Sequence, residues 1–145
     1  MRFPPAQDKG GAYEPRRTRR KTYMVINCTP HDVCIYRGSD CCYMDGKFYL
    51  REDMDIQLFI TYPAAAEPAR VNFAQTYAGM ADGILVFRWV PDEIVNLPDP
   101  KPGTYYIVSK MLAQACPERK DLIFPGTLVR NESGYVVGCI DFSRV

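Results

Sequence analysis

The clearest secondary-structure pattern of this sequence lies in residues 104–116, Thr-Tyr-Tyr-Ile-Val-Ser-Lys-Met-Leu-Ala-Gln-Ala-Cys. The first five residues are all aromatic or β-branched, which is the composition of a buried strand. Ser109 is a good helix N-cap, residues 110–116 then suit a helix, and Pro117 ends it. The segment therefore predicts a strand that leads directly into a helix.

The other apolar segments on both sides of this stretch are short and typical of strands. They are residues 23–28, 33–37, 56–61, 69–73, 83–89, 122–124, 127–130 and 135–141, with a hairpin at 43–49 around Asp45-Gly46. Gly83–Trp89 is apolar on both faces at its centre, which predicts a strand inside a sheet. Residues 91–102 hold four prolines and predict a crossing loop.

Seven to nine short strands and one convincing helix place the chain in the α+β class, mostly β. We expect a curled, barrel-like sheet, antiparallel or mixed, with the helix packed on one face. The 145 residues are enough for one domain with a real core. We predict a single β-rich binding domain over residues 22–145.

Residues 1–21 are expected to form a disordered basic tail, because proline, glycine and arginine dominate and few aliphatic residues are present. Residues 1–22 carry seven basic and two acidic groups, +5, whereas the rest of the chain carries −4. The mildly acidic body does not favour nucleic acid. The tail is either a solubilising segment or a contact for nucleic acid or an acidic partner.

The chain has six cysteines and is expected to be cytoplasmic. No signal-peptide pattern and no apolar run of about 18 residues is present, so we expect neither secretion nor a membrane span. The cysteines are then expected to be reduced thiols, packed for the most part as small apolar groups. Their spacing lacks a Cys-x-x-Cys pair, so neither a metal site nor a cofactor is predicted.

Catalysis is not predicted, because none of the common catalytic or phosphate-loop motifs occurs. His31 is the single histidine. It could serve as a base for a cysteine nucleophile, bind backbone in the turn after Pro30, or contact a ligand. The turn is the favoured interpretation, and the other two remain open.

The sequence indicates ligand binding more clearly than catalysis. Arg70, Arg88 and Arg130 lie within or next to apolar strand segments, where an arginine must find a carboxylate or an anionic ligand. Internal ion pairs and ligand binding are equally compatible with this placement. Aromatic residues next to turns can stack on a base or on a partner, although most are expected in the core.

Several blocks taken in order resemble a family of small proteins encoded by phages and prophages. The blocks are residues 27–31 (Asn-Cys-Thr-Pro-His), 63–71, 83–86, 97–109, 124–131 (Phe-Pro-Gly-Thr-Leu-Val-Arg-Asn) and 138–139. Together they cover about residues 23–142. The basic tail and the insertion between His31 and Pro63 depart from the usual short version of the family.

The family is similar to phage anti-defence sponge proteins of the Thoeris anti-defence type. The resemblance implies a non-enzymatic homo-oligomer in the cytoplasm of a bacterial host cell, which sequesters a cyclic nucleotide or a cyclic ADP-ribose signal without cleaving it. It would make Arg70 and Arg130 the phosphate contacts and Tyr106 a stacking platform. The candidate polar contacts would be Asn27, Thr29, His31, Ser109 and Asn131.

Two other functions remain open from the residues themselves. One is a protein-interaction module that inhibits a host or phage protein directly, with the basic tail ordering on contact. The other is a small hydrolase or transferase that depends on His31.

Overall fold

The computed structural model describes residues 23–51 and 58–145. As the sequence predicts, this part is mostly β, with mixed sheets of short strands and one short helix. The predicted basic tail at 1–21 lies outside the described residues, as do the first two residues of the predicted strand at 56–61. The elements in chain order are β1 (Met24–Asn27), β2 (Val33–Ile35), the 3-10 turn η2 (Gly38–Asp40), β3 (Cys41–Met44), β4 (Lys47–Leu50), β5 (Ile60–Tyr62), β6 (Arg70–Ala81), β7 (Ile84–Val95), β8 (Thr104–Ile107), α2 (Lys110–Ala115), β9 (Leu122–Pro125), β10 (Leu128–Arg130), β11 (Val136–Cys139) and β12 (Phe142–Ser143).

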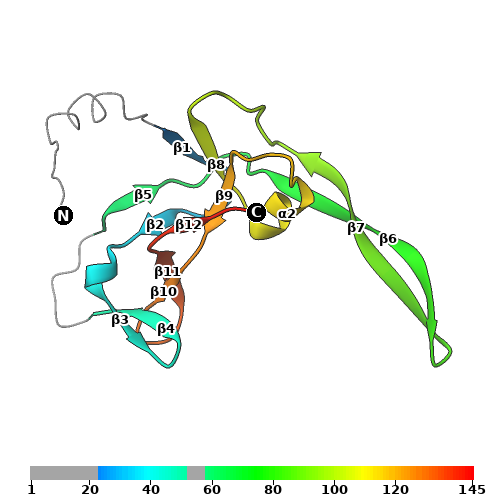
Figure 1. The fold of residues 1–145 in the computed structure, drawn as a ribbon, viewed down its shortest axis with the longest axis horizontal. Coiled ribbons are helices and arrows are strands. Elements are labelled where there is room, and N and C mark those ends of the chain that lie inside the picture. The colour runs from blue at the N-terminus through cyan, green and yellow to red at the C-terminus, as the bar shows by residue number, and fades with distance from the viewer. Residues whose placement is uncertain (1–22, 52–57) are drawn as a thin grey trace, which may run out of the picture.

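The described strands form three sheets (Figure 1). A four-stranded sheet has the order β1-β8-β9-β12, in which β8 runs parallel to both neighbours and β12 closes the edge antiparallel to β9. A six-stranded sheet has the order β3-β4-β10-β11-β2-β5 and mixes parallel and antiparallel pairs. Among the described strands, β6 and β7 pair only with each other.

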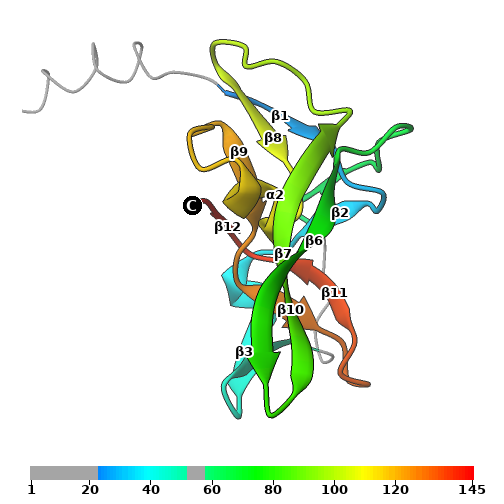
Figure 2. The same ribbon diagram turned by 90° about the vertical axis from the view of Figure 1, so that its right-hand side faces the viewer.

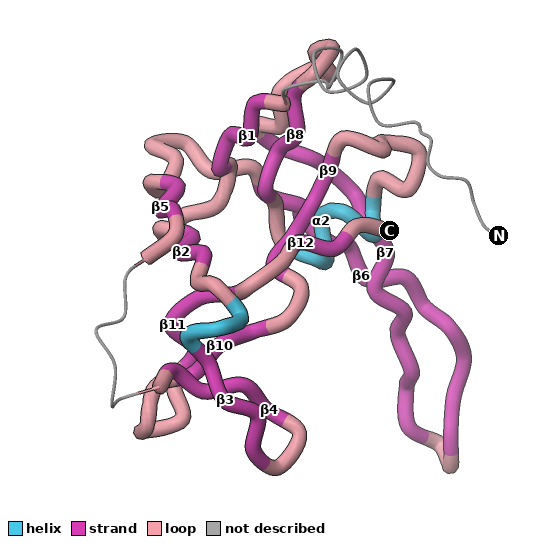
Figure 3. The backbone as a smooth tube through the Cα atoms, turned by 60° about the vertical axis from the view of Figure 1, so that its left-hand side comes forward, coloured by secondary structure: helices cyan, strands magenta, loops and turns pink. Residues whose placement is uncertain are grey.

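The four-stranded sheet is the middle layer of the body. Successive side chains of a strand point to opposite faces, and β8 shows this directly. Tyr106 packs in one core cluster with Leu112 of α2, whereas Ile107 packs in a second cluster with Val33 and Ile35 of the six-stranded sheet. Helix α2 therefore covers one face of the middle sheet and the six-stranded sheet covers the other (Figures 1 and 3).

Two local predictions depend on short-range chemistry, and both are confirmed. The Ser109 hydroxyl oxygen accepts a 3.1 Å hydrogen bond from the Leu112 N–H and caps α2. The β3–β4 hairpin turns at Asp45-Gly46, where both residues have positive φ, 52° and 79°. Such a turn favours Asp-Gly because its backbone twist matches that of the paired strands.

The prediction that Gly83–Trp89 forms an internal strand is wrong. These residues belong to β7, which pairs with β6 in a two-stranded arm that extends from the body (Figures 1 and 2). Strand β6 is also much longer than the predicted segment at 69–73. The apolar composition on both faces was interpreted as burial between layers, but the outer half of the arm is exposed.

The crossing loop predicted at residues 91–102 begins later than expected, because β7 continues through Pro91 to Val95. Proline cannot donate to a ladder, but it is tolerated on an edge strand. In a two-stranded sheet each strand is an edge. Pro91 pairs with Phe73, directly next to a register shift between Asn72 and Phe73. The free edge of the arm therefore accommodates a residue that a central strand would exclude.

Candidate functional site

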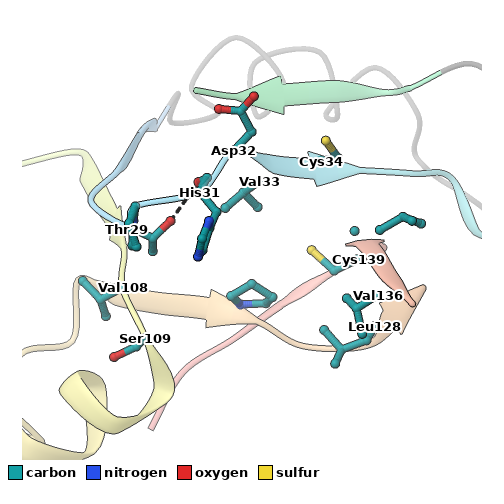
Figure 4. Close-up of a pocket in the computed structure, with 14 residues that line it drawn as sticks. Thr29, His31, Asp32, Val33, Cys34, Val108, Ser109, Leu128, Val136 and Cys139 are labelled. Atoms are coloured by element: carbon teal, nitrogen blue, oxygen red, sulfur yellow. Dashed lines mark hydrogen bonds between the residues drawn. The ribbon is translucent and has the colours of Figure 1, made fainter. Parts of the chain in front are cut away.

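A cavity of about 540 Å³ lies where the β1–β2 loop, the start of α2 and strands β9–β11 meet (Figure 4). Its lining is mostly apolar, with a few polar groups on one side. The lining residues are Thr29, Pro30, His31, Asp32, Val33, Cys34, Val108, Ser109, Pro125, Leu128, Val136, Val137, Gly138 and Cys139. A volume in this range is typical of small-molecule sites, which join an apolar wall to a few orienting polar groups.

The loop that carries the polar groups is built around Asn27, the one buried polar residue among those described. Its side-chain oxygen accepts hydrogen bonds from the Thr29 N–H at 2.9 Å and from the Thr29 hydroxyl at 2.7 Å. Its amide nitrogen donates to the carbonyl oxygens of His31 at 2.8 Å and Tyr62 at 3.1 Å. The four bonds use both acceptor and both donor positions of the amide, so Asn27 fixes the loop backbone and does not itself line the cavity.

His31 brings an imidazole to the cavity, because its main chain is held by the Asn27 amide. In Figure 4 the ring points from the loop into the space between the elements. Asp32 follows it in sequence but turns away, and its Oδ1 accepts a 2.8 Å hydrogen bond from the Ala64 N–H. The carboxylate thus anchors the segment after β5.

Two thiols also line the cavity, Cys34 on β2 and Cys139 on β11. Burial, together with the nearby Asp141 carboxylate, raises the pKa of Cys139 to about 11. A thiol with that pKa is protonated at neutral pH and is a poor nucleophile. The six cysteines are all free, and three of them, Cys28, Cys116 and Cys139, are buried in the core.

Gly138 forms part of the wall and permits the close approach of β11 to β2. A side-chain carbon at this position would collide with the Cys34 carbonyl and would lie 2.7 Å from the Tyr36 ring. The cavity wall at this place therefore depends on a residue without a side chain.

The structure brings three of the predicted site residues together: Thr29, His31 and Ser109 line the same cavity. His31 lies in the turn after Pro30, and its carbonyl oxygen accepts a hydrogen bond from the Asn27 side chain. This contact differs from the bond between His31 and backbone that the favoured interpretation expected, so that interpretation stays a prediction. The imidazole, in contrast, faces the cavity (Figure 4).

Tyr106 is not available as a stacking platform, which corrects the prediction. It is 1% exposed, it packs in the cluster under α2, and its hydroxyl donates to the Asp99 carbonyl at 3.1 Å. An aromatic ring can stack on a ligand only from an exposed face, and the alternation of β8 turns this ring inward.

The two arginines predicted as phosphate contacts lie in different sheets, and neither lines the cavity. Arg70 is exposed at the start of β6. Arg130 lies on β10, and its guanidinium donates to the Gly134 carbonyl at 2.9 Å. The structure does not assemble the expected arginine pair, because β6 leaves the body while β10 lies inside the six-stranded sheet.

Asn131 has a structural role in the β10–β11 turn that the sequence predicts at residues 131–134. Its side-chain oxygen accepts hydrogen bonds from the Ser133 and Tyr135 N–H groups, each at 3.0 Å. It does not line the cavity. The polar candidates Asn27 and Asn131 thus shape turns, whereas Thr29, His31 and Ser109 face the cavity.

The apolar wall was missed by the reasoning from sequence. Leu128, Val136 and Val137 carry no chemical signal, and in a β-rich chain such residues are expected in any strand. The one signal in the sequence was the predicted β10–β11 hairpin. The structure shows that Leu128 and Val136 of this hairpin are 39% and 48% exposed. Only the packing of this hairpin next to the β1–β2 loop turns these residues into a wall.

Within the described residues, no group of three or more His, Cys, Asp or Glu side chains is placed to hold a metal ion. In the same part of the chain, no helix combines the length and apolar character that crossing a membrane requires.

Comparison of this chain with protein-family models, with curated proteins and with solved structures found no match. The resemblance to phage anti-defence proteins therefore stays a prediction.

Proposed function

We propose that this chain binds a small ring-containing ligand in the cavity between the β1–β2 loop and the β10–β11 hairpin, and releases it unchanged. The observation that carries the proposal is the combination of an apolar wall with the His31 imidazole and two hydroxyl side chains. An apolar wall supplies affinity through burial, and a few polar groups orient the ligand.

The chemistry of the lining favours holding a ligand over transforming it. The Cys139 thiol is protonated at neutral pH, and the Ser109 hydroxyl oxygen already accepts the helix N–H of Leu112. The Asp32 carboxylate is engaged by the Ala64 N–H and turned away from His31. A nucleophile paired with an oriented base, which covalent catalysis needs, is not what these contacts produce.

A nucleotide signal is the specific ligand class that we propose, following the resemblance. The base and ribose suit the apolar wall and the hydroxyl groups. Among the described residues of the lining, His31 is the one basic side chain. A cyclic mononucleotide, which carries a single negative charge, therefore fits this cavity better than a ligand with several phosphates. Arg70 and Arg130 are not invoked as phosphate contacts.

The experiment is calorimetric titration of the full chain with a panel of cyclic mononucleotides, cyclic dinucleotides and cyclic ADP-ribose. After binding, the protein is heat-denatured and the supernatant is analysed by chromatography. We expect one class to bind and to return intact. Altered ligand in the supernatant would overturn the non-enzymatic part of the proposal, and no binding by any member would overturn the ligand class.

Three variants test whether the ligand binds in this cavity. Val136→Phe narrows the cavity from a half-exposed position and is expected to abolish binding. His31→Ala removes one oriented contact and is expected to weaken binding by about tenfold, which corresponds to one hydrogen bond. Arg70→Ala is the matched control on the arm and is expected to bind as the wild type. Loss of binding in the Arg70 variant alone would place the ligand elsewhere.

A further inference from the structure

The outer half of the β6–β7 arm carries an apolar face that no other part of the described chain covers. Five large side chains on it are each about half exposed or more. They are Tyr77 (60%), Met80 (60%), Leu85 (56%), Phe87 (47%) and Trp89 (62%). We refer to these five residues as the aromatic face.

The pairing register places these side chains on one side of the arm. Cross-strand partners share a face, and Tyr77 pairs with Phe87, Met80 with Leu85, and Gln75 with Trp89. The rings of Tyr77 and Phe87 lie 6.2 Å apart, in an edge-to-face arrangement. The intervening pair, Thr76 with Arg88, points to the opposite side.

The same side of β6 is covered at the base of the arm. Val71 packs against the core cluster that contains Leu112 of α2. Val71, Phe73, Gln75 and Tyr77 alternate along β6 without an inserted residue, so they share one side. The aromatic face is therefore the continuation of a core-facing surface along the arm, which extends beyond the body (Figure 1).

We propose that a second copy of this chain covers the aromatic face, arm against arm about a two-fold axis. An aromatic side chain presents roughly 150–250 Å², so the exposed fractions give about 500 Å² of apolar surface. A stable interface buries about 800 Å² on each partner, of which about 60% is apolar. The aromatic face thus supplies the apolar share that one side of a dimer needs.

The charges also fit a contact of the face with itself. In a two-fold contact each patch meets its own copy, so a charge near the axis would meet a like charge. The five residues of the aromatic face include no charged side chain. Within residues 73–89 the charged groups are Asp82, at the turn, and Arg88, on the opposite side. Nucleic acid and anionic membranes are recognised by clustered lysine and arginine, which this segment does not have.

Sedimentation of the full chain, together with the emission of its single tryptophan, tests the proposal. Trp89 lies on the aromatic face and is the only tryptophan of the chain, so its emission reports burial of this surface directly. We expect a dimer at micromolar concentration. We also expect a blue-shifted emission that moves toward that of exposed tryptophan on dilution.

A charge pair then tests the two-fold geometry. Phe87→Glu and Phe87→Lys each bring like charges together near the axis, and we expect each variant to dissociate at least ~100-fold more readily than the wild type. Mixing the two variants brings opposite charges together and should restore the dimer. Thr76→Glu, on the opposite side and next to Arg88, is the matched control and should stay dimeric.

Three results would overturn the proposal. The first is a wild-type chain that is monomeric at about 100 μM, because stable interfaces of about this size dissociate at micromolar concentration or below. Such a chain would overturn the proposal even if it bound a different protein. The second is persistence of the dimer in both Phe87 variants. The third is failure of the mixed variants to pair, because a face that meets itself must respond to the charge swap. None of these results touches the cavity, whose ligand binding is measured separately.

Discussion

Replacement of Asn27 by alanine is expected to destabilise the fold strongly, although the residue is small and polar. Asn27 is 8% exposed and makes four side-chain hydrogen bonds, to Thr29 (two), His31 and Tyr62. A net contribution of about 0.5–1.5 kcal/mol for each bond, with an added cost for partners left unsatisfied near the core, gives a loss of about 3 kcal/mol. The variant tests whether this residue builds the site loop, as the structure has it, or contacts ligand.

The assay is urea unfolding followed by far-UV circular dichroism. With a slope of about 2 kcal/mol/M, the expected loss lowers the midpoint by about 1.5 M. Asn131→Ala is the matched control, because the Asn131 amide oxygen also accepts two hydrogen bonds, here both from backbone N–H groups, but in an exposed turn. Water replaces those bonds, so we expect a loss of about 1 kcal/mol or less.

A result in which both variants lose the same small amount would refute the reasoning, because the expected difference rests on the burial of Asn27 and on the two further hydrogen bonds that its amide nitrogen donates. Asn27→Asp separates the two roles of the amide further. It keeps the acceptor for Thr29 but places a carboxylate against the His31 and Tyr62 carbonyl oxygens, and should be no more stable than the alanine variant.

Three further predictions concern other parts of the body. Gly138→Ala places a carbon against the Cys34 carbonyl and should lower stability by about 1–3 kcal/mol in the same urea assay; a neutral result would contradict the close approach of β11 to β2. The Arg119 side chain, whose Nε lies 2.8 Å from Asp121 Oδ1, lowers the pKa of that carboxyl chiefly through the hydrogen bond. This pair therefore stabilises the fold above about pH 4, and the contribution is lost as the pH falls through the depressed folded-state pKa; Asp121→Asn should flatten the acid limb of a stability–pH curve, and an unchanged acid limb would contradict this role. Cys139, with its raised pKa and no exposed surface, should resist iodoacetamide at pH 8 until urea unfolds the chain, as measured by peptide mass; labelling in the native state would show that the cavity wall opens.

The features that the sequence determined by itself are those that depend on neighbours in the chain. Ser109 caps α2 and Asp45-Gly46 turns a hairpin, because an N-cap and a two-residue turn are complete within a few residues. The short apolar segments rich in aromatic and β-branched residues were likewise enough to predict a mostly β fold. His31 drew attention as the single histidine, and the structure places it on the cavity.

Only the tertiary structure decided which surfaces meet. Tyr106 and Ile107 are adjacent in the chain and similar in character, yet one packs under α2 and the other between the sheets. Asn27 was a candidate ligand contact until its bond to the Tyr62 carbonyl, 35 residues away, showed its amide to be fully used. Gly83–Trp89 has the composition of a buried strand, but the chain places it in an arm outside the body. The composition of a segment indicates that its side chains tend to be buried. It does not indicate whether they are buried in the core of the same chain or, as we propose for the aromatic face, against a second copy of the chain.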